Sequence, residues 1–157
     1  MRTPPGGRSG WLLMLALLGV LLLGVEAGAR PARAGTLVVT TTADSGPGSL
    51  RDAIETANST PGLDTITFNI PGPIDHTTDT YVISPLSMLP TITDPIVIDG
   101  STQPGYGHVP LVELRGASAG SGVSGLVVTG GGSTIRALAI SRFSSYGLAI
   151  TGAGNNA

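Results

Sequence analysis

Carboxylates are the side chains beyond residue 34 most suited to chemistry, but their spacing argues against a catalytic pair. Glycoside hydrolysis requires two carboxyl groups roughly 5 to 10 Å apart, and the chain contains no Asp-Asp, Asp-x-Asp or Asn-x-Asp. Asp94 and Asp99 come nearest, but they flank an apolar run and five extended residues would separate them by about 15 Å. Asp99-Gly100 is better interpreted as a turn. We therefore expect no catalytic residue among the acids, which are Asp44, Asp52, Glu55, Asp64, Asp75, Asp79, Asp94, Asp99 and Glu113.

Histidines are the next candidates, as metal ligands or bases. His76 lies between Asp75 and Asp79 in a polar segment, which is either a weak metal site or a solvated loop, and we favour the loop. His108 is also interpreted as a loop residue. Gly130-Gly-Gly has the glycines of a calcium-binding β-roll repeat but lacks its Asp. We expect no metal and no cofactor.

Three arginines and two tyrosines could meet a polymeric ligand. Arg115, Arg136 and Arg142 could contact a carbohydrate or anionic polymer, but pairing with nearby acids is the interpretation we favour. Tyr106 and Tyr146 could stack on sugars, and we favour packing for both. Asn58-Ser-Thr forms a glycosylation sequon, which we expect to be unused because it falls at a predicted helix end.

Composition excludes several function classes. The 157 residues include no Cys and only 11% charged residues, and the net charge is −2. A disulfide scaffold and a Cys-ligated metal are excluded. Nucleic-acid binding is disfavoured because it needs clustered Lys and Arg, and a hydrophobic content of 41% disfavours disorder.

The amino-terminal residues resemble an export signal. Arg2 and Arg8 precede an uninterrupted apolar run at 11–25, and a small-x-small pattern of Ala32, Arg33 and Ala34 follows it. This arrangement predicts a signal peptide over 1–34, cleaved between Ala34 and Gly35, and a secreted or cell-surface protein. A retained anchor is the alternative, although the run is shorter than the ~20 residues that span a bilayer. We expect membrane contact only through this segment, before cleavage.

Segment 35–63 is predicted to hold one strand and one helix. Residues 36–42 are rich in β-branched side chains, which favours a strand. Ser49 and Asp52 have the spacing of a helix cap, and they begin a predicted helix over 49–58. An apolar stripe on this helix is formed by Leu50, Ala53, Ile54 and Ala57.

Segment 64–157 is predicted to consist of short strands, at 65–70, 81–83, 96–98, 111–114, 126–128, 135–140 and 148–150. Residues 125–135 match residues 147–157 at an offset of 22, with five of eleven pairs identical. This period is typical of one coil of a parallel β-helix. Leu126 and Val128 would then stack on Leu148 and Ile150 in one inward ladder. The predicted fold class is all-β, a right-handed parallel β-helix of about four coils with a short amino-terminal capping helix. A β-sandwich is the alternative.

Several motifs carry a resemblance to a known family. Residues 49–54 (SLRDAI), 57–58 (AN) and 64–68 (DTITF), with 89–95 (LPTITDP) and 98–106 (IDGSTQPGY), resemble exported bacterial right-handed β-helix proteins with a CSLREA-type amino-terminal domain. That fold is related to pectate lyases. Gly48 and Asp52 stand where the family has Cys and Glu. The resemblance implies that the helix covers the open end of the β-helix.

The last feature is where the repeat stops. Its second copy ends at Ala157, in mid-coil, which predicts either a truncated chain or an edge completed by another chain through self-association. We expect a non-catalytic exported or cell-surface scaffold that binds polysaccharide or cell-envelope components. The alternative is the amino-terminal part of a polysaccharide lyase or glycoside hydrolase whose active site lies beyond Ala157.

Overall fold

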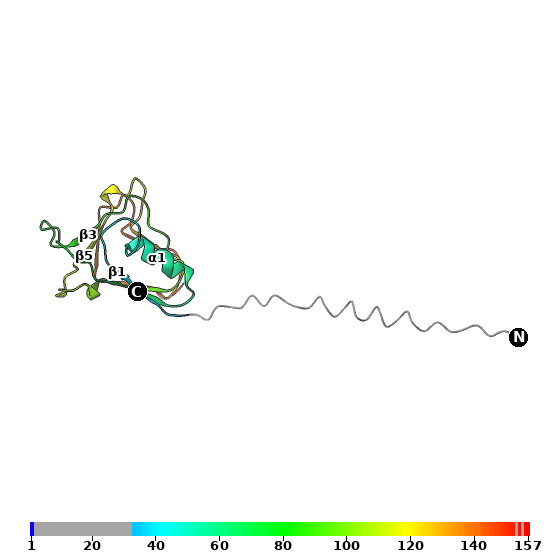
Figure 1. The fold of residues 1–157 in the computed structure, drawn as a ribbon. Coiled ribbons are helices and arrows are strands. Elements are labelled where there is room, and N and C mark those ends of the chain that lie inside the picture. The colour runs from blue at the N-terminus through cyan, green and yellow to red at the C-terminus, as the bar shows by residue number, and fades with distance from the viewer. Residues whose placement is uncertain (2–32, 153, 155) are drawn as a thin grey trace. The chain divides into compact units, whose positions relative to one another are not determined.

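A computed structural model gives the fold, and it describes residues 1, 33–152, 154, 156 and 157. The chain divides into two units, Met1–Arg30 and Pro31–Ala157, and the elements described below all belong to the second (Figure 1). The apolar run at 11–25 lies outside the described residues. Within the described part, no helix is both long and apolar enough to cross a membrane.

The amino-terminal elements are strand β1 (Thr36–Val39) and helix α1 (Leu50–Ser59). The predicted apolar stripe is the buried face of α1, formed by Leu50, Ala53, Ile54 and Ala57. This face packs against β1 and against β2 (Asp64–Phe68). The helix therefore packs beside the first two strands of the sheet.

Eight of the nine strands in the described part follow α1. They pair in three parallel sheets of order β1-β2-β4-β7, β3-β5-β8 and β6-β9. The remaining bounds are β3 (Tyr81–Ile83), β4 (Ile96–Asp99), β5 (Val112–Arg115), β6 (Leu126–Val128), β7 (Thr134–Arg136), β8 (Leu138–Ser141) and β9 (Leu148–Ile150).

The chain visits the three sheets in rotation. Strands β4, β5 and β6 lie in the first, second and third sheet, and β7, β8 and β9 repeat that order. The preceding round is β2, β3 and then Ile92, which forms a parallel bridge to Val128. Every pairing between the named strands of the described part is parallel, which differs from the antiparallel sheets of a β-sandwich. The described protein is thus strand-rich, with little helix.

The strand register confirms the 22-residue match in one sheet only. Leu126 pairs with Leu148 and Val128 with Ile150, as the repeat predicts. Elsewhere the prediction of a short period is wrong, because Val97 pairs with Thr134, 37 residues later. Long connections therefore reduce the number of rounds. From Asp64 onward the first sheet receives three strands, β2, β4 and β7, rather than about four.

One predicted strand is divided into two. Residues 135–140 were expected to form a single run, but Ala137 has a φ of 55° and separates β7 from β8. A left-handed backbone conformation is uncommon for Ala, so no sequence signal marks this corner. Gly100 lies beside it, and a Cβ atom at Gly100 would overlap the Ala137 carbonyl group.

The core lies between the sheets and α1. Its largest fully buried members include Phe68, Ile66, Ile98, Leu114 and Leu126. The predicted inward ladder of the third sheet is buried in β6 but partly exposed in β9. Leu126 and Val128 are each 1% exposed, whereas Leu148 is 39% and Ile150 49% exposed. The difference arises because β6 lies between β9 and the segment at Ile92, whereas β9 has a described partner on one side only.

Candidate functional site

A group of polar side chains lies on the sheet formed by β3, β5 and β8. We call it the Glu113 cluster, and its members are Asp75, Thr78, Thr80, Glu113, Arg115 and Ser141. Glu113 and Arg115 are alternate residues of β5, so their side chains leave the strand on the same side. Ser141 is brought in by β8, where it pairs in register with Arg115. The threonines and Asp75 come from the loop before β3.

Glu113 is held by three partners. The Arg115 guanidinium grips it side-on, with Nε 3.0 Å from Oε1 and Nη2 2.7 Å from Oε2. Ser141 donates to Oε1 at 2.6 Å and Thr80 donates to Oε2 at 3.2 Å. The residue is 6% exposed. This buried carboxylate therefore has a charged partner and two hydroxyl donors.

Arg115 extends the cluster toward the surface. Its Nη1 lies 3.2 Å from Oδ2 of Asp75, and Nη2 donates to the Thr78 hydroxyl at 3.3 Å. The Thr78 and Thr80 hydroxyl oxygens are 2.7 Å apart. With Thr80 donating to Glu113, Thr78 is left to donate to Thr80. The hydrogen bonds thus form a closed circuit through Arg115, Thr78, Thr80 and Glu113.

The contacts in the cluster lower the pKa of both of its carboxyl groups. The hydrogen bonds from Arg115 lower the pKa of Glu113 to about 2, against the opposing effect of burial. The pKa of Asp75 is also lowered, chiefly by the Thr77 amide and secondarily by Arg115. The pKa of Arg115 is raised by Glu113. A carboxylate held ionised in this way is a poor proton donor and a poor general base.

A second ion pair links two neighbouring strands, β4 and β7, of the first sheet. Arg136 of β7 lies opposite Asp99 of β4 and donates to its carboxylate. This contact is the main reason that the pKa of Asp99 is lowered. Asp99 also accepts from the amide and hydroxyl of Ser101. The expectation that Arg115 and Arg136 pair with acids is therefore confirmed.

The other candidate residues remain apart from one another. Asp94 accepts from the Gly62 amide at 3.1 Å, whereas Asp99 pairs with Arg136. His76 and Asp79 are exposed loop residues, and Asp75 turns to Arg115 instead. Among the residues that the structure describes, no group of three or more His, Cys, Asp or Glu is placed to hold a metal ion.

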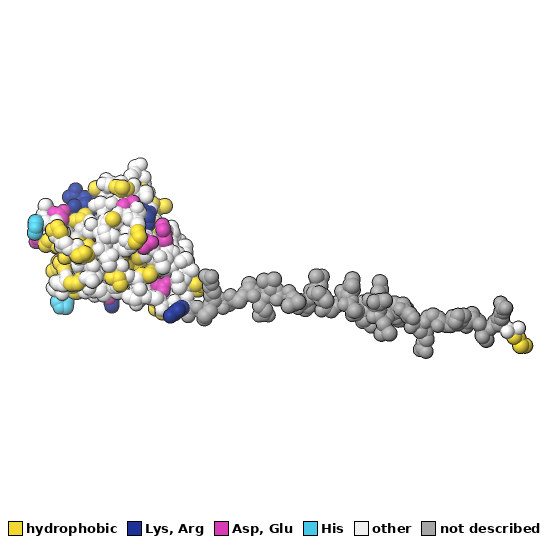
Figure 2. Space-filling view, in the orientation of Figure 1, with side chains coloured by type: hydrophobic (Ala, Val, Ile, Leu, Met, Phe, Trp, Pro, Cys, Tyr) yellow, Lys and Arg dark blue, Asp and Glu magenta, His cyan; other side chains and the backbone are white. Residues whose placement is uncertain are grey.

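Exposed aromatic and basic residues do not converge either. His108 is exposed with a φ of 70°, and its ring meets Tyr106 edge-on with centroids 5.9 Å apart. Arg142 is exposed with a φ of 57°. On the face shown in Figure 2, charged side chains lie in small separate groups rather than in one patch.

Two motif side chains hold backbone groups of other segments. Gln103 is 2% exposed, and it accepts from the Ile70 amide at 2.9 Å and donates to the Ile70 carbonyl at 3.0 Å. Asn58 donates to the Thr91 carbonyl and accepts from the Thr93 amide. The sequon asparagine is thus engaged in packing α1 against residues 91–93.

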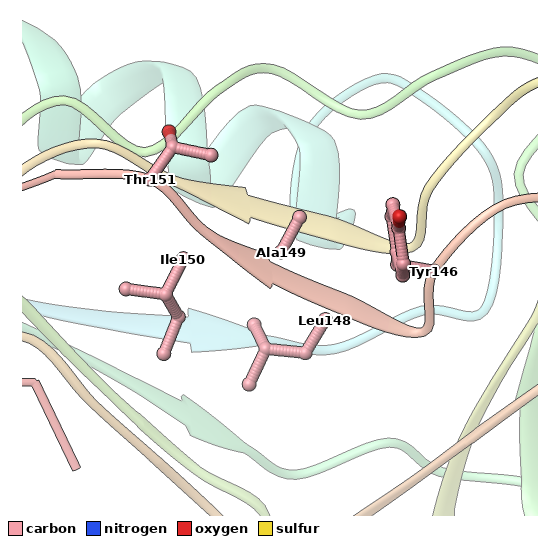
Figure 3. Close-up of a pocket in the computed structure, with 5 residues that line it drawn as sticks. All are labelled: Tyr146, Leu148, Ala149, Ile150 and Thr151. Carbon is pink, nitrogen blue, oxygen red and sulfur yellow. The ribbon is translucent and has the colours of Figure 1, made fainter.

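The exposed part of β9 lines a shallow hollow of about 350 Å³. Leu148 and Ile150 point to one side of the strand and Ala149 to the other (Figure 3). Tyr146 is 67% exposed at its edge, which differs from the packed position we favoured. Three of its five lining side chains are apolar, Tyr146 and Thr151 add hydroxyls, and none of the five is a carboxylate or an imidazole.

The cap and cleavage residues lie at the amino-terminal end of the second unit. Ser49 precedes α1, and its hydroxyl accepts from the Asp52 amide at 3.2 Å. The Asp52 carboxylate accepts from the Gly48 amide at 3.3 Å. Ala34 is exposed and Gly35 is half-buried, whereas Ala32 lies outside the described residues.

Sequence reasoning missed the Glu113 cluster as a unit. The alternation of Glu113 and Arg115 along one strand was an available signal, because it places both side chains on one face. Their partners were not predictable in the same way, since Asp75 and Ser141 reach the cluster through loop conformation and strand register.

Comparison with known proteins adds no relative. No family model, no curated protein and no solved structure matches the chain.

Proposed function

We propose that residues 35–157 form a right-handed parallel β-helix, capped by α1, that acts as a non-catalytic exported scaffold. The rotation of strands through three parallel sheets supports the coil architecture. The right hand follows from the preference of parallel crossover connections. The resemblance to exported β-helix proteins with a CSLREA-type domain, and the signal-like residues 1–34, support export to the surface or the medium.

The Glu113 cluster carries the non-catalytic part of the proposal. Its buried carboxylate is saturated by Arg115, Ser141 and Thr80, and its pKa near 2 keeps it ionised. Asp99 is engaged in the same way by Arg136 and Ser101. Glycosidases instead keep one carboxyl group protonated and leave room for a nucleophile. These acids therefore hold strands together.

The proposed ligands are polysaccharide or cell-envelope components. A stack of short strands presents rows of side chains at a regular spacing, which suits a repeating polymer. To test this, the chain would be produced in an export host and collected from the medium and from the cell surface. The product would then be incubated with a neutral glucan, polygalacturonate and peptidoglycan sacculi.

The expected result is retention on at least one polymer without new reducing ends or unsaturated sugar products. The matched variant is Glu113→Gln, which removes the charge of the buried Glu113 carboxylate while preserving the size of the side chain. Product release by the native chain that Glu113→Gln abolished would overturn the scaffold proposal and favour the alternative, part of a polysaccharide lyase or hydrolase.

A further inference from the structure

Gly35 is fixed at the start of β1 by both of its backbone polar groups. Its nitrogen donates to Oδ1 of Asp64 at 2.6 Å, and its carbonyl accepts from the Thr65 amide at 2.9 Å. A Cβ atom at this position would lie 2.9 Å from the same Oδ1. The Gly35 nitrogen is therefore held close against the Asp64 carboxylate.

Asp64, the acceptor of the Gly35 amide, is a buried acid and only 2% exposed. Among the described residues its carboxylate accepts no hydrogen bond other than that from Gly35. Burial of a charged carboxylate is costly unless a positive charge or several donors compensate for it. In the uncleaved chain Gly35 offers a single neutral N–H.

We propose that export processing supplies the missing charge: the mature chain begins at Gly35, and its α-ammonium group pairs with Asp64. Hydrolysis of the Ala34–Gly35 peptide bond by a host signal peptidase consumes one water. It leaves a carboxylate on Ala34 and an ammonium group on Gly35. The nitrogen that already lies 2.6 Å from Oδ1 then carries three protons and a positive charge.

This inference rests on the exported state in the proposed function and adds a role for the cleavage site. Cleavage would convert a neutral hydrogen bond into a charge-assisted one, which is shorter and stronger. The first strand of the molecule would thereby be tied to β2 by an ion pair as well as by the ladder. Processing and the stability of the amino-terminal coil would be coupled.

Few other titratable groups face this pair. Strand β1 carries none, and β4 contributes only Asp99, which Arg136 neutralises. On the helix and in the loops, Arg51 is paired with Asp44, and Glu55 is exposed. The Asp52 carboxylate accepts from the Gly48 amide, and the Asp94 carboxylate accepts from the Gly62 amide. Arg33 is removed by the cleavage.

The chain offers a clean readout because it contains no lysine. After cleavage, the α-amine of Gly35 is the sole primary amine in residues 35–157. Reductive methylation with formaldehyde and cyanoborohydride would therefore modify that atom alone, and mass spectrometry would follow it. Only the unprotonated amine reacts, so the rate reports the fraction of free, neutral amine.

The test uses the full chain, 1–157, produced in an export host, with the exported product sequenced from its amino terminus. We expect Gly35 as the first residue. At pH 7.5 the native product should be methylated at least ~tenfold more slowly than the same product in urea, corresponding to a rise of one unit in the α-amine pKa. Asp64→Asn should remove most of this protection, and Asp64→Glu should retain part of it.

Two results would overturn the proposal. A first residue other than Gly35 would show that the cleavage prediction is wrong. A product that begins at Gly35 but reacts equally fast in native buffer and in urea would show that the ion pair does not form. The comparison within the native sequence does not depend on either variant folding. The polymer-binding experiment is separate, so its failure is distinguishable from both results.

Discussion

Glu113 shows how the surroundings of a single residue can fix its protonation state and its partners. The carboxylate is buried beside β8, yet Arg115 keeps it ionised and two hydroxyl groups occupy its remaining acceptor positions. An ionised carboxylate without these partners would be costly to bury at this position. The residue is therefore best understood as the charged link that joins β5, β8 and the loop before β3.

The Glu113→Gln variant tests this role. The amide retains the size of the side chain but replaces a charged acceptor, so the Arg115 contact weakens and Nη2 or Nε loses a partner. We expect a loss of about 2 kcal/mol in the free energy of unfolding at pH 7, measured by urea titration. Glu55→Gln, on the exposed side of α1, is the matched control and should change stability by less than about 0.5 kcal/mol.

The same residue gives a pH dependence of known sign. Its pKa is about 2 in the folded protein and about 4.3 in an unfolded chain. A lowered folded-state pKa means that the contribution is complete above the unfolded value and is lost as pH falls toward 2. The stability difference between the native chain and Glu113→Gln should thus shrink between pH 5 and pH 2. A difference that stayed constant over this range would contradict the ion-pair account.

At the scale of elements, close stacking at the strand corners depends on small residues. Gly100 follows β4, and the Ala137 carbonyl group occupies the space where its Cβ atom would lie. Gly100→Ala should therefore cost about 2 to 3 kcal/mol, because backbone must move to admit the methyl group. Gly107→Ala is the matched control, since nothing lies within 4 Å of that position. Equal unfolding midpoints for the two variants in thermal melts would contradict the close packing of Gly100 against the Ala137 carbonyl group.

The elements also show what the sequence could and could not predict. Helix α1 was predictable because its apolar stripe and the Ser49 cap are local signals, and β3, β6 and β9 match the predicted runs residue for residue. The corner at Ala137 was not, because nothing about Ala indicates a positive φ. The Glu113 cluster depends on which strands become neighbours, and strand register is set by the whole stack.

At the scale of the molecule, the three sheets make stability depend on position in the stack. Among the described residues, strands β2 and β4 each have partners on both sides, whereas β7, β8 and β9 have one partner each. Burial follows the same gradient, from Ile66 and Ile98 at 0% exposed to Ile150 at 49%. In the proposed β-helix each layer would be supported mainly by its neighbours, so local opening should begin at the least supported strand.

Hydrogen exchange resolved to single amides would measure this gradient. Amides in β2 and β4 should exchange only through global unfolding, whereas those of Leu148 and Ile150 should exchange through low-energy local opening. The expected order of protection is therefore β2 and β4, then β7 and β8, then β9. Equal protection of β4 and β9 at every protein concentration would contradict a layered stack. Protection of β9 that rose with concentration, while β4 stayed unchanged, would show that a second copy of the chain covers this apolar edge.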